Sequence, residues 1–152
     1  MFFRTHLVIL LFFWLLFFQS IPNPCISLAV AIFATMLPDI DNKFSILGRY
    51  RLSRIFNFFV KHRGITHSFL FLFLVSIPIS LFAKEFLLIF ILGYLLHLFL
   101  DGITVQGVSF FYPLKNKLKG PIKTGGFFEN ISFGFFFLAD LFLILIRFYN
   151  VL

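Results

Sequence analysis

Five long apolar runs dominate the chain, and short polar segments separate them. A helix that crosses the hydrocarbon core of a bilayer needs about 20 predominantly apolar residues. The pattern predicts an all-α, polytopic membrane helical bundle of about five transmembrane helices, at residues 7–18, 25–37, 68–83, 86–104 and 127–147. The first two runs are shorter than a full span, so we expect those helices to be tilted in a locally thinned bilayer or to carry polar ends below the headgroups.

The first run could also be a secretion signal, because Arg4 precedes its apolar residues. Residues 18–25 contain no small-residue cleavage site, however, and they form a poor lipoprotein signal before Cys25. We therefore expect the first helix to be retained, with a proline-rich turn at residues 22–24 leading into the second.

Residues 49–61 follow an amphipathic pattern instead. Leu52, Ile55, Phe56 and Phe59 recur at helical spacing, while the basic side chains lie off that stripe. The pattern predicts one interfacial amphipathic helix resting on anionic lipid. A helix packed against the protein's own spans is an equally good interpretation.

The lysines and arginines predict the orientation in the membrane. When the N-terminus and the segments 38–66 and 105–126 are placed on one side, all 13 Lys and Arg residues lie there except Lys84 and Arg147. Cytoplasmic loops carry the excess of positive charge. We therefore expect a multi-pass protein of the inner (cytoplasmic) membrane, with its N-terminus in the cytoplasm and its C-terminus outside.

Composition agrees with a membrane protein. The chain is 61% hydrophobic and 12% charged, whereas soluble domains carry about 25% charged residues. We expect a single membrane-embedded domain over residues 1–152. The net charge of +7 is spread between apolar runs, which favours membrane lipid as the partner and makes nucleic acid unexpected. The one cysteine, Cys25, cannot form an internal disulfide, and no feature indicates a protein partner.

Ionisable residues gather at the predicted cytoplasmic ends of four consecutive helices. They comprise all four histidines and three of the aspartates: His6, Asp39, Asp41, His62, His67, His97 and Asp101. A charged aspartate at the bilayer centre costs roughly 2.5–3.5 kcal/mol, so such groups are expected to face inward and to pair. We therefore expect these seven side chains to converge on one pocket.

Imidazole and carboxylate ligands together suit a divalent metal. His97 and Asp101 are four residues apart and share a helix face, while Asp39 and Asp41 follow Pro38 at a helix end. The donor set favours Zn²⁺, with Mn²⁺ or Fe²⁺ as alternatives, and seven candidates leave room for a second ion. The alternatives for the individual residues are an interfacial histidine, capping aspartates and a structural His–Asp hydrogen bond.

The segment 62–68 adds two further candidates. The planar guanidinium of Arg63 matches phosphate oxygens, although Arg63 also fits as one more positive residue of the cytoplasmic side. Thr66 or Ser68 is better interpreted as the N-cap of the third helix than as a nucleophile.

Several blocks resemble the YdjM family. They are Leu-Pro-Asp-Ile-Asp-Asn at 37–42, His-Arg-Gly-Ile-Thr-His-Ser at 62–68 and the stretch at 93–101, together with Thr5-His6, Thr104, Gly107-Val108, residues 111–113 and residues 124–129. The family consists of small inner-membrane proteins described as LexA-binding, metal-dependent hydrolases with suspected phospholipase-like activity. Asn42 stands where members often have histidine, and nothing in this chain indicates LexA binding.

The resemblance implies a metal-dependent hydrolase that cleaves an ester, in the first place a phospholipid phosphoester. A divalent ion would activate water at the cytoplasmic interface. Asp39 would accept the proton, Arg63 would hold the phosphate, and Glu129 would act as a general base or ligand. Glu129 is equally well explained as a first-turn acid that the helix dipole stabilises.

A non-enzymatic membrane protein with a structural or transport-related metal site is the alternative function. Ionisable residues inside membranes commonly mark ion pathways. An adaptor that recruits partners through the lysines of segment 115–123 has little support, because those lysines already serve topology.

Overall fold

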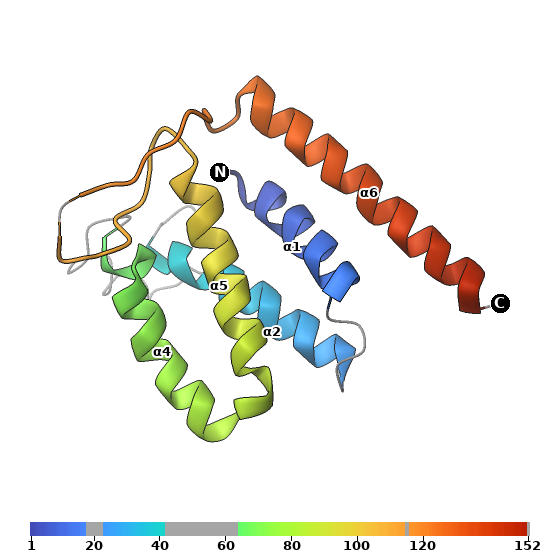
Figure 1. Cartoon of the computed structure of the whole chain (residues 1–152), viewed down its shortest axis with the longest axis horizontal. Helices are drawn as coiled ribbons and strands as arrows, with labels where there is room; N and C mark the ends of the chain where they lie inside the picture. The colour runs from blue at the N-terminus through green and yellow to red at the C-terminus, as the bar shows by residue number, and fades with distance from the viewer. Residues whose placement is uncertain (18–22, 42–63, 115, 152) are drawn as a thin grey trace.

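The structure is a computed structural model that describes residues 1–17, 23–41, 64–114 and 116–151. In these ranges the chain is helical, and its only β-pairing consists of two isolated bridges, Thr104–Ile122 and Val108–Leu118. Three short 3₁₀ helices, η1 (Leu37–Asp41), η2 (Ile65–His67) and η3 (Lys84–Phe86), accompany the α-helices α1 (Phe3–Phe17), α2 (Pro24–Met36), α4 (Phe69–Phe82), α5 (Leu87–Gly102) and α6 (Phe127–Val151) (Figure 1).

The five expected helices are present, and local signals set their ends. Pro24 occupies the first turn of α2, where its missing N–H costs nothing. Ser68 caps α4, because its hydroxyl accepts a hydrogen bond of 3.3 Å from the amide of Phe71. The first helix begins at Phe3, earlier than the apolar run, so His6 lies inside α1.

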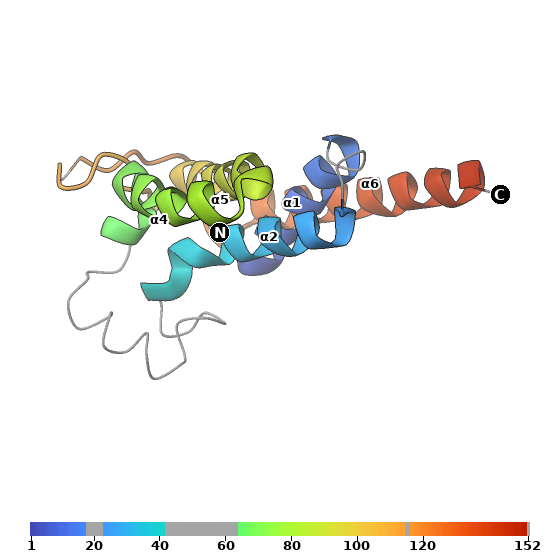
Figure 2. The ribbon, with the colours of Figure 1, turned by 90° about the horizontal axis from the view of Figure 1, so that it is seen from below.

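The helices bring the described parts of the segments expected on one side of the membrane to one end of the assembly. Helices α1 and α6 lie side by side and run in the same direction, since Arg4 binds Asn130 near their starts and Arg147 binds Leu15 near their ends. Figures 1 and 2 show α5 between α4 and α1, with α2 against it. The start of α1, the end of α2 and the end of α5 therefore meet.

The packed centre lies between α2, α4 and α5. Phe90, Tyr94 and Leu98 of α5 are fully buried and form one hydrophobic cluster with Ala34 and Leu72. Between membrane helices the hydrophobic effect is weak, and small residues at the interface stabilise packing by letting backbones approach. Gly93 serves this purpose here: a Cβ atom at that position would lie 2.9 Å from the carbonyl oxygen of Ala31.

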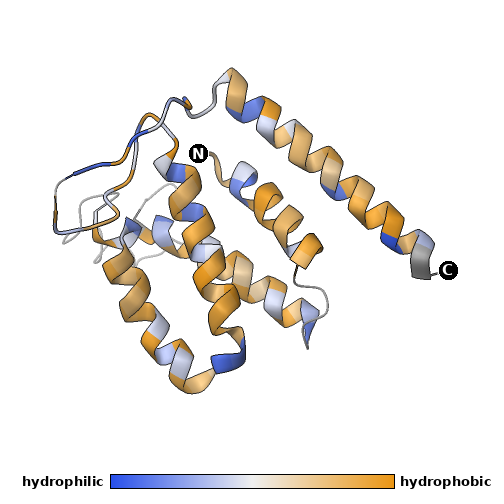
Figure 3. Ribbon diagram, in the orientation of Figure 1, coloured by the Kyte–Doolittle hydropathy of each residue, from blue (hydrophilic) through white to orange (hydrophobic). Residues whose placement is uncertain are grey.

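Within the described part of the chain, two helices are long and apolar enough to cross a membrane, namely Lys84–Gly102 and Phe127–Tyr149. Helices α1, α2 and α4 are apolar but have only 15, 13 and 14 residues. Figure 3 shows apolar residues along all five helices. The all-helical class is therefore confirmed, whereas five full spans stay a prediction. The expected interfacial helix at 49–61 lies outside the described residues.

The contact at Gly93 generates a prediction about stability. Gly93→Ala should lower the free energy of unfolding by about 1–3 kcal/mol, because α2 and α5 must separate to admit the methyl group. Gly134→Ala on α6 is the matched control, since nothing lies within 4 Å of its Cβ position. The control should be neutral or stabilising by up to about 1 kcal/mol. Thermal unfolding in detergent measures both, and equal effects of the two substitutions would contradict the close packing.

Candidate metal centre

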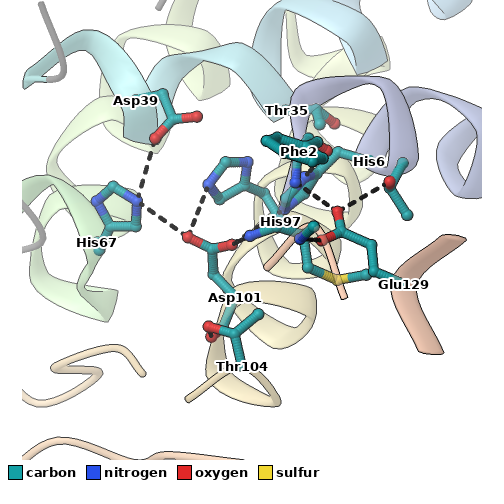
Figure 4. Close-up of polar contacts among 12 residues, drawn as sticks. Phe2, His6, Thr35, Asp39, His67, His97, Asp101, Thr104 and Glu129 are labelled. Carbon is teal, nitrogen blue, oxygen red and sulfur yellow. Dashed lines mark hydrogen bonds and ion pairs between the residues drawn. The ribbon is translucent and has the colours of Figure 1, made fainter. Parts of the chain in front are cut away.

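Five of the predicted ligands converge where α1, α2 and α5 meet. His6 comes from α1, Asp39 from η1 at the end of α2, His67 from η2, and His97 and Asp101 from the last turns of α5. Figure 4 shows their side chains directed toward one another. All three imidazoles are almost completely buried, with 1% or less of each residue exposed.

The first donor group consists of His6, His97 and Asp101. One nitrogen or oxygen from each lies within 4.8 Å of the others. The Nε2 atom of His6 is 3.5 Å from Oδ1 of Asp101. The imidazoles of His6 and His97 stack with their centroids 4.3 Å apart. The four-residue spacing of His97 and Asp101 does put them together, with Nε2 of His97 3.9 Å from Oδ2.

The second donor group consists of Asp39, His67 and His97, again with donor atoms within 4.8 Å of one another. Nε2 of His67 lies 3.6 Å from Oδ1 of Asp39 and 3.8 Å from Oδ2 of Asp101. His97 belongs to both groups. Asp101 links them, because one of its oxygens faces His6 and the other faces His67 and His97 (Figure 4).

The orientation of His6 leaves one nitrogen available for a metal. Its Nδ1 atom lies 3.0 Å from the carbonyl oxygen of Phe2. A carbonyl only accepts, so Nδ1 carries a proton, and Nε2 faces Oδ1 of Asp101. Nε2 of His6 and both ring nitrogens of His97 have no hydrogen-bond partner among the described residues. A lone pair that faces a carboxylate is repulsive unless a cation or proton lies between them.

The amino group of Met1 supplies one positive charge at this point. It donates a hydrogen bond to Oδ1 of Asp101, and both groups are buried. His67, which also contacts Asp39, faces the other oxygen of Asp101, Oδ2. The amino group therefore contacts the side of the site that His6 faces, at Oδ1 of Asp101, while His67 and His97 face Oδ2.

The carboxyl group of Asp39 lies in η1, beyond the end of α2. Burial raises its pKa, but the hydrogen bond with His67 and the neighbouring imidazoles outweigh burial and lower the pKa to about 2. Asp39 is thus ionised at neutral pH. An ionised carboxylate at this place can bind a cation or accept a proton.

Glu129 is buried next to the site but belongs to neither donor group. Its Oε1 atom accepts hydrogen bonds from the amide of Phe2 at 2.5 Å and the hydroxyl of Thr5 at 3.0 Å. Its Oε2 atom accepts one of 2.6 Å from the amide of Gly125. These bonds fasten the first residues of the chain to the start of α6, and so they help to fix the position of His6.

A second layer of polar residues supports the ligands, and sequence reasoning missed its members. The Tyr94 hydroxyl donates to the carbonyl of Thr66, which ties η2 and His67 to α5. The hydroxyl of Thr104 donates to the carbonyl of Asp101 at 2.7 Å. Tyr94 stands one turn before His97 in an apolar helix, and a buried hydroxyl there needs a hydrogen-bond partner. This position could have indicated from the sequence that Tyr94 supports the site.

Three predicted site residues are not placed. His62 and Arg63 lie outside the described residues, and so does the side chain of Asp41, whose backbone belongs to η1. The structure therefore brings together His6, Asp39, His67, His97 and Asp101. As a donor set, imidazoles and carboxylates fit Zn²⁺, Mn²⁺ or Fe²⁺.

Known proteins share this chain's sequence pattern. It matches the family described as YdjM inner membrane protein over residues 1–151. It is 30% identical over 115 residues to the uncharacterized protein YvsG of Bacillus subtilis (strain 168), with 72% of each chain covered. It is 35% identical over 102 residues to the inner membrane protein YdjM of Escherichia coli (strain K12) and of Shigella flexneri, which covers 60% of this chain and 52% of each relative.

The match thus spans about half the length of the Escherichia coli relative. No solved structure matches the chain. The family match extends over nearly all of the sequence and includes every residue of the two donor groups. It confirms the family expected from the sequence blocks. The chain belongs to the YdjM family of inner membrane proteins.

Proposed function

We propose that this protein is a membrane-bound, metal-dependent hydrolase whose two donor groups hold one or two divalent ions. The observation that carries the proposal is the convergence of three buried imidazoles on the carboxylate of Asp101 at 3.5–3.9 Å. Zinc binds nitrogen and oxygen ligands at about 2.0–2.2 Å, which leaves the ligands of one ion roughly 3–4 Å apart. Only small side-chain shifts would then be needed to bind the ion.

The number of donors also supports a catalytic site. Each group has three, as in catalytic zinc sites, where three protein ligands leave a position open for water or substrate. A bound divalent ion would supply Lewis-acid chemistry and an activated water for ester hydrolysis. Asp39 and Asp101 would neutralise its charge, and the Phe2 carbonyl would hold His6 in the ligating tautomer.

We further propose that the substrate is a phosphoester of a membrane lipid. The donor groups lie at one end of helices whose outer surfaces are largely apolar, so a lipid could reach them from the bilayer. Thr104 donates to the carbonyl of Asp101, and its own carbonyl accepts from the amide of Gly120, in the segment that carries Lys117, Lys119 and Lys123. Those cations would attract an anionic headgroup, and Arg63 is proposed to bind its phosphate.

The proposed topology is multi-pass with a cytoplasmic N-terminus. The parallel course of α1 and α6 supports it, because both helices then leave the same side. Lys84 lies in η3, at the end of the assembly away from the donor groups, whereas the lysine-rich 115–123 segment follows the end of α5. This distribution agrees with the excess of positive charge in cytoplasmic loops.

A structural metal site is the second candidate function. The nearly complete burial of His6, His67 and His97 favours it, because structural sites are closed to solvent. Transport has less support: Asp140 is a further buried acid along α6, but one carboxylate does not make a pathway. The enzyme and the structural site differ in turnover, which the following measurements address.

Removal of His97 should be the most damaging ligand substitution, because His97 alone belongs to both donor groups. We expect His97→Ala to weaken zinc binding by more than about 100-fold, beyond the 10–100-fold typical of second-shell changes. His6→Ala should leave the second donor group able to bind zinc, and His67→Ala should leave the first donor group able to do so. Metal content by mass spectrometry and zinc titration give the comparison. Ser80→Ala on the exposed face of α4 is the control, and equal losses in all four variants would contradict the assignment.

Metal binding should weaken as the pH falls. An ordinary imidazole takes up a proton near pH 6.5 and then cannot coordinate. Because protons compete with the metal for the imidazole nitrogens, the affinity should fall, and the number of protons released per ion bound should rise, as the pH is lowered from 8 to 5. Asp39, with its pKa of about 2, stays ionised throughout this range. Calorimetric zinc titrations between pH 5 and 8 measure the effect, and a flat profile would exclude histidine ligation.

Hydrolysis is tested with purified protein in detergent and phosphatidylglycerol as substrate. Zinc- or manganese-loaded wild-type protein should cleave a phosphoester bond and release either diacylglycerol and glycerol phosphate or phosphatidic acid and glycerol. The rate should fall at least about 100-fold in His97→Ala and in Asp101→Asn, as expected when metal-dependent water activation fails. Ser80→Ala again serves as control. Metal-loaded protein that is inactive with all three ions, Zn²⁺, Mn²⁺ and Fe²⁺, would refute the enzyme and leave the structural site.

A further inference from the structure

The lining of an apolar groove includes Leu10 and Gly93, which lie four residues from His6 and His97 respectively. The groove has a volume of about 550 Å³ and lies between α1 and α5, with Ala31 of α2 at its floor. Every side chain that lines it is apolar or aromatic. The volume falls within the range of small-molecule sites, about 300–1,000 Å³.

The groove and the metal centre occupy the same helix faces. On α1, Leu10, Trp14 and Phe17 line the groove, and Leu10 and Trp14 lie four and eight residues after His6, which keeps them on one face. On α5, Gly93 lines the groove one turn before His97. A molecule lying along this groove would therefore have one end at the imidazoles.

We propose that this groove binds one acyl chain of the lipid whose ester lies at the metal centre. The lining from Ile89 to Phe99 spans about 15 Å along α5. A single extended hydrocarbon chain matches this length and the wholly apolar lining.

The chemistry of the walls also selects hydrocarbon. The one polar atom of Trp14, Nε1, donates a 3.1 Å hydrogen bond to the hydroxyl of Ser27, so its ring presents only apolar surface. Phe17 and Leu92 are 66% and 41% exposed, which leaves the groove accessible from the side. Lipid could thus enter laterally from the bilayer. The assignment of this lipid as substrate rests on the proposed hydrolase function, whereas its binding does not.

Trp14 is the only tryptophan of the chain, so its fluorescence reports on the groove. The probe is phosphatidylglycerol with bromine atoms on the acyl chains, titrated into the full-length protein in detergent micelles. We expect saturable quenching of Trp14. Leu92→Phe/Leu96→Phe, which narrows the groove from α5, should raise the half-saturating lipid concentration at least tenfold. The control, Leu74→Phe/Leu81→Phe, alters exposed positions of α4 and should match the wild type.

The outcomes separate the groove from the catalytic proposal. His97→Ala should still show saturable quenching, since it leaves the groove walls intact. Quenching that rises linearly without saturation, or that is unchanged in Leu92→Phe/Leu96→Phe, would overturn the acyl-chain site even if the protein hydrolyses lipid. Saturable binding without turnover would uphold the groove and refute the hydrolase. Should the double variant not fold, Leu92→Phe alone must give a smaller shift in the same direction.

Discussion

The structure depends on the placement of one buried carboxylate, that of Asp101, among three imidazoles. Each imidazole comes from a different segment, so the contact joins α1, η2 and α5 at a single point. Unpaired ionisable groups at this depth are costly, and the segments stay together only while the charges and lone pairs are balanced. One divalent cation would neutralise the carboxylate and coordinate the imidazole lone pairs at the same time. Without it, several imidazole rings would each have to bind a proton.

The surrounding packing maintains this arrangement. Gly93 lets α5 approach α2, which brings Asp39 toward His97. Tyr94 ties η2 to α5, and Glu129 fastens the start of α1 to α6. In a membrane, where hydrogen bonds and close contacts replace the hydrophobic effect as the source of specificity, these bonds decide which polar groups meet. The same faces of α1 and α5 continue into the apolar groove, so ester and hydrocarbon would be bound by one continuous surface.

Much of this was predictable from the sequence. The apolar runs marked the five helices to within a few residues, because hydropathy alone fixes where a chain can be helical in lipid. The shared face of His97 and Asp101 followed from their spacing. The shared pocket of His6 and Asp101 was expected from the helix ends, but their direct contact was not, since it depends on how α1 packs. For Glu129 the sequence left a site role and a helix-dipole role open; it could not show that both oxygens accept hydrogen bonds, from Phe2, Thr5 and Gly125.

The ligand shell of the bound metal is the most direct test of this account. X-ray absorption of the zinc-loaded protein should show nitrogen and oxygen neighbours at about 2.0–2.2 Å, with the outer-shell scattering of imidazole rings. That scattering should weaken in His97→Ala. A spectrum without imidazole, or with sulfur at about 2.3 Å from Cys25, would mean that zinc binds elsewhere and would contradict the proposed centre.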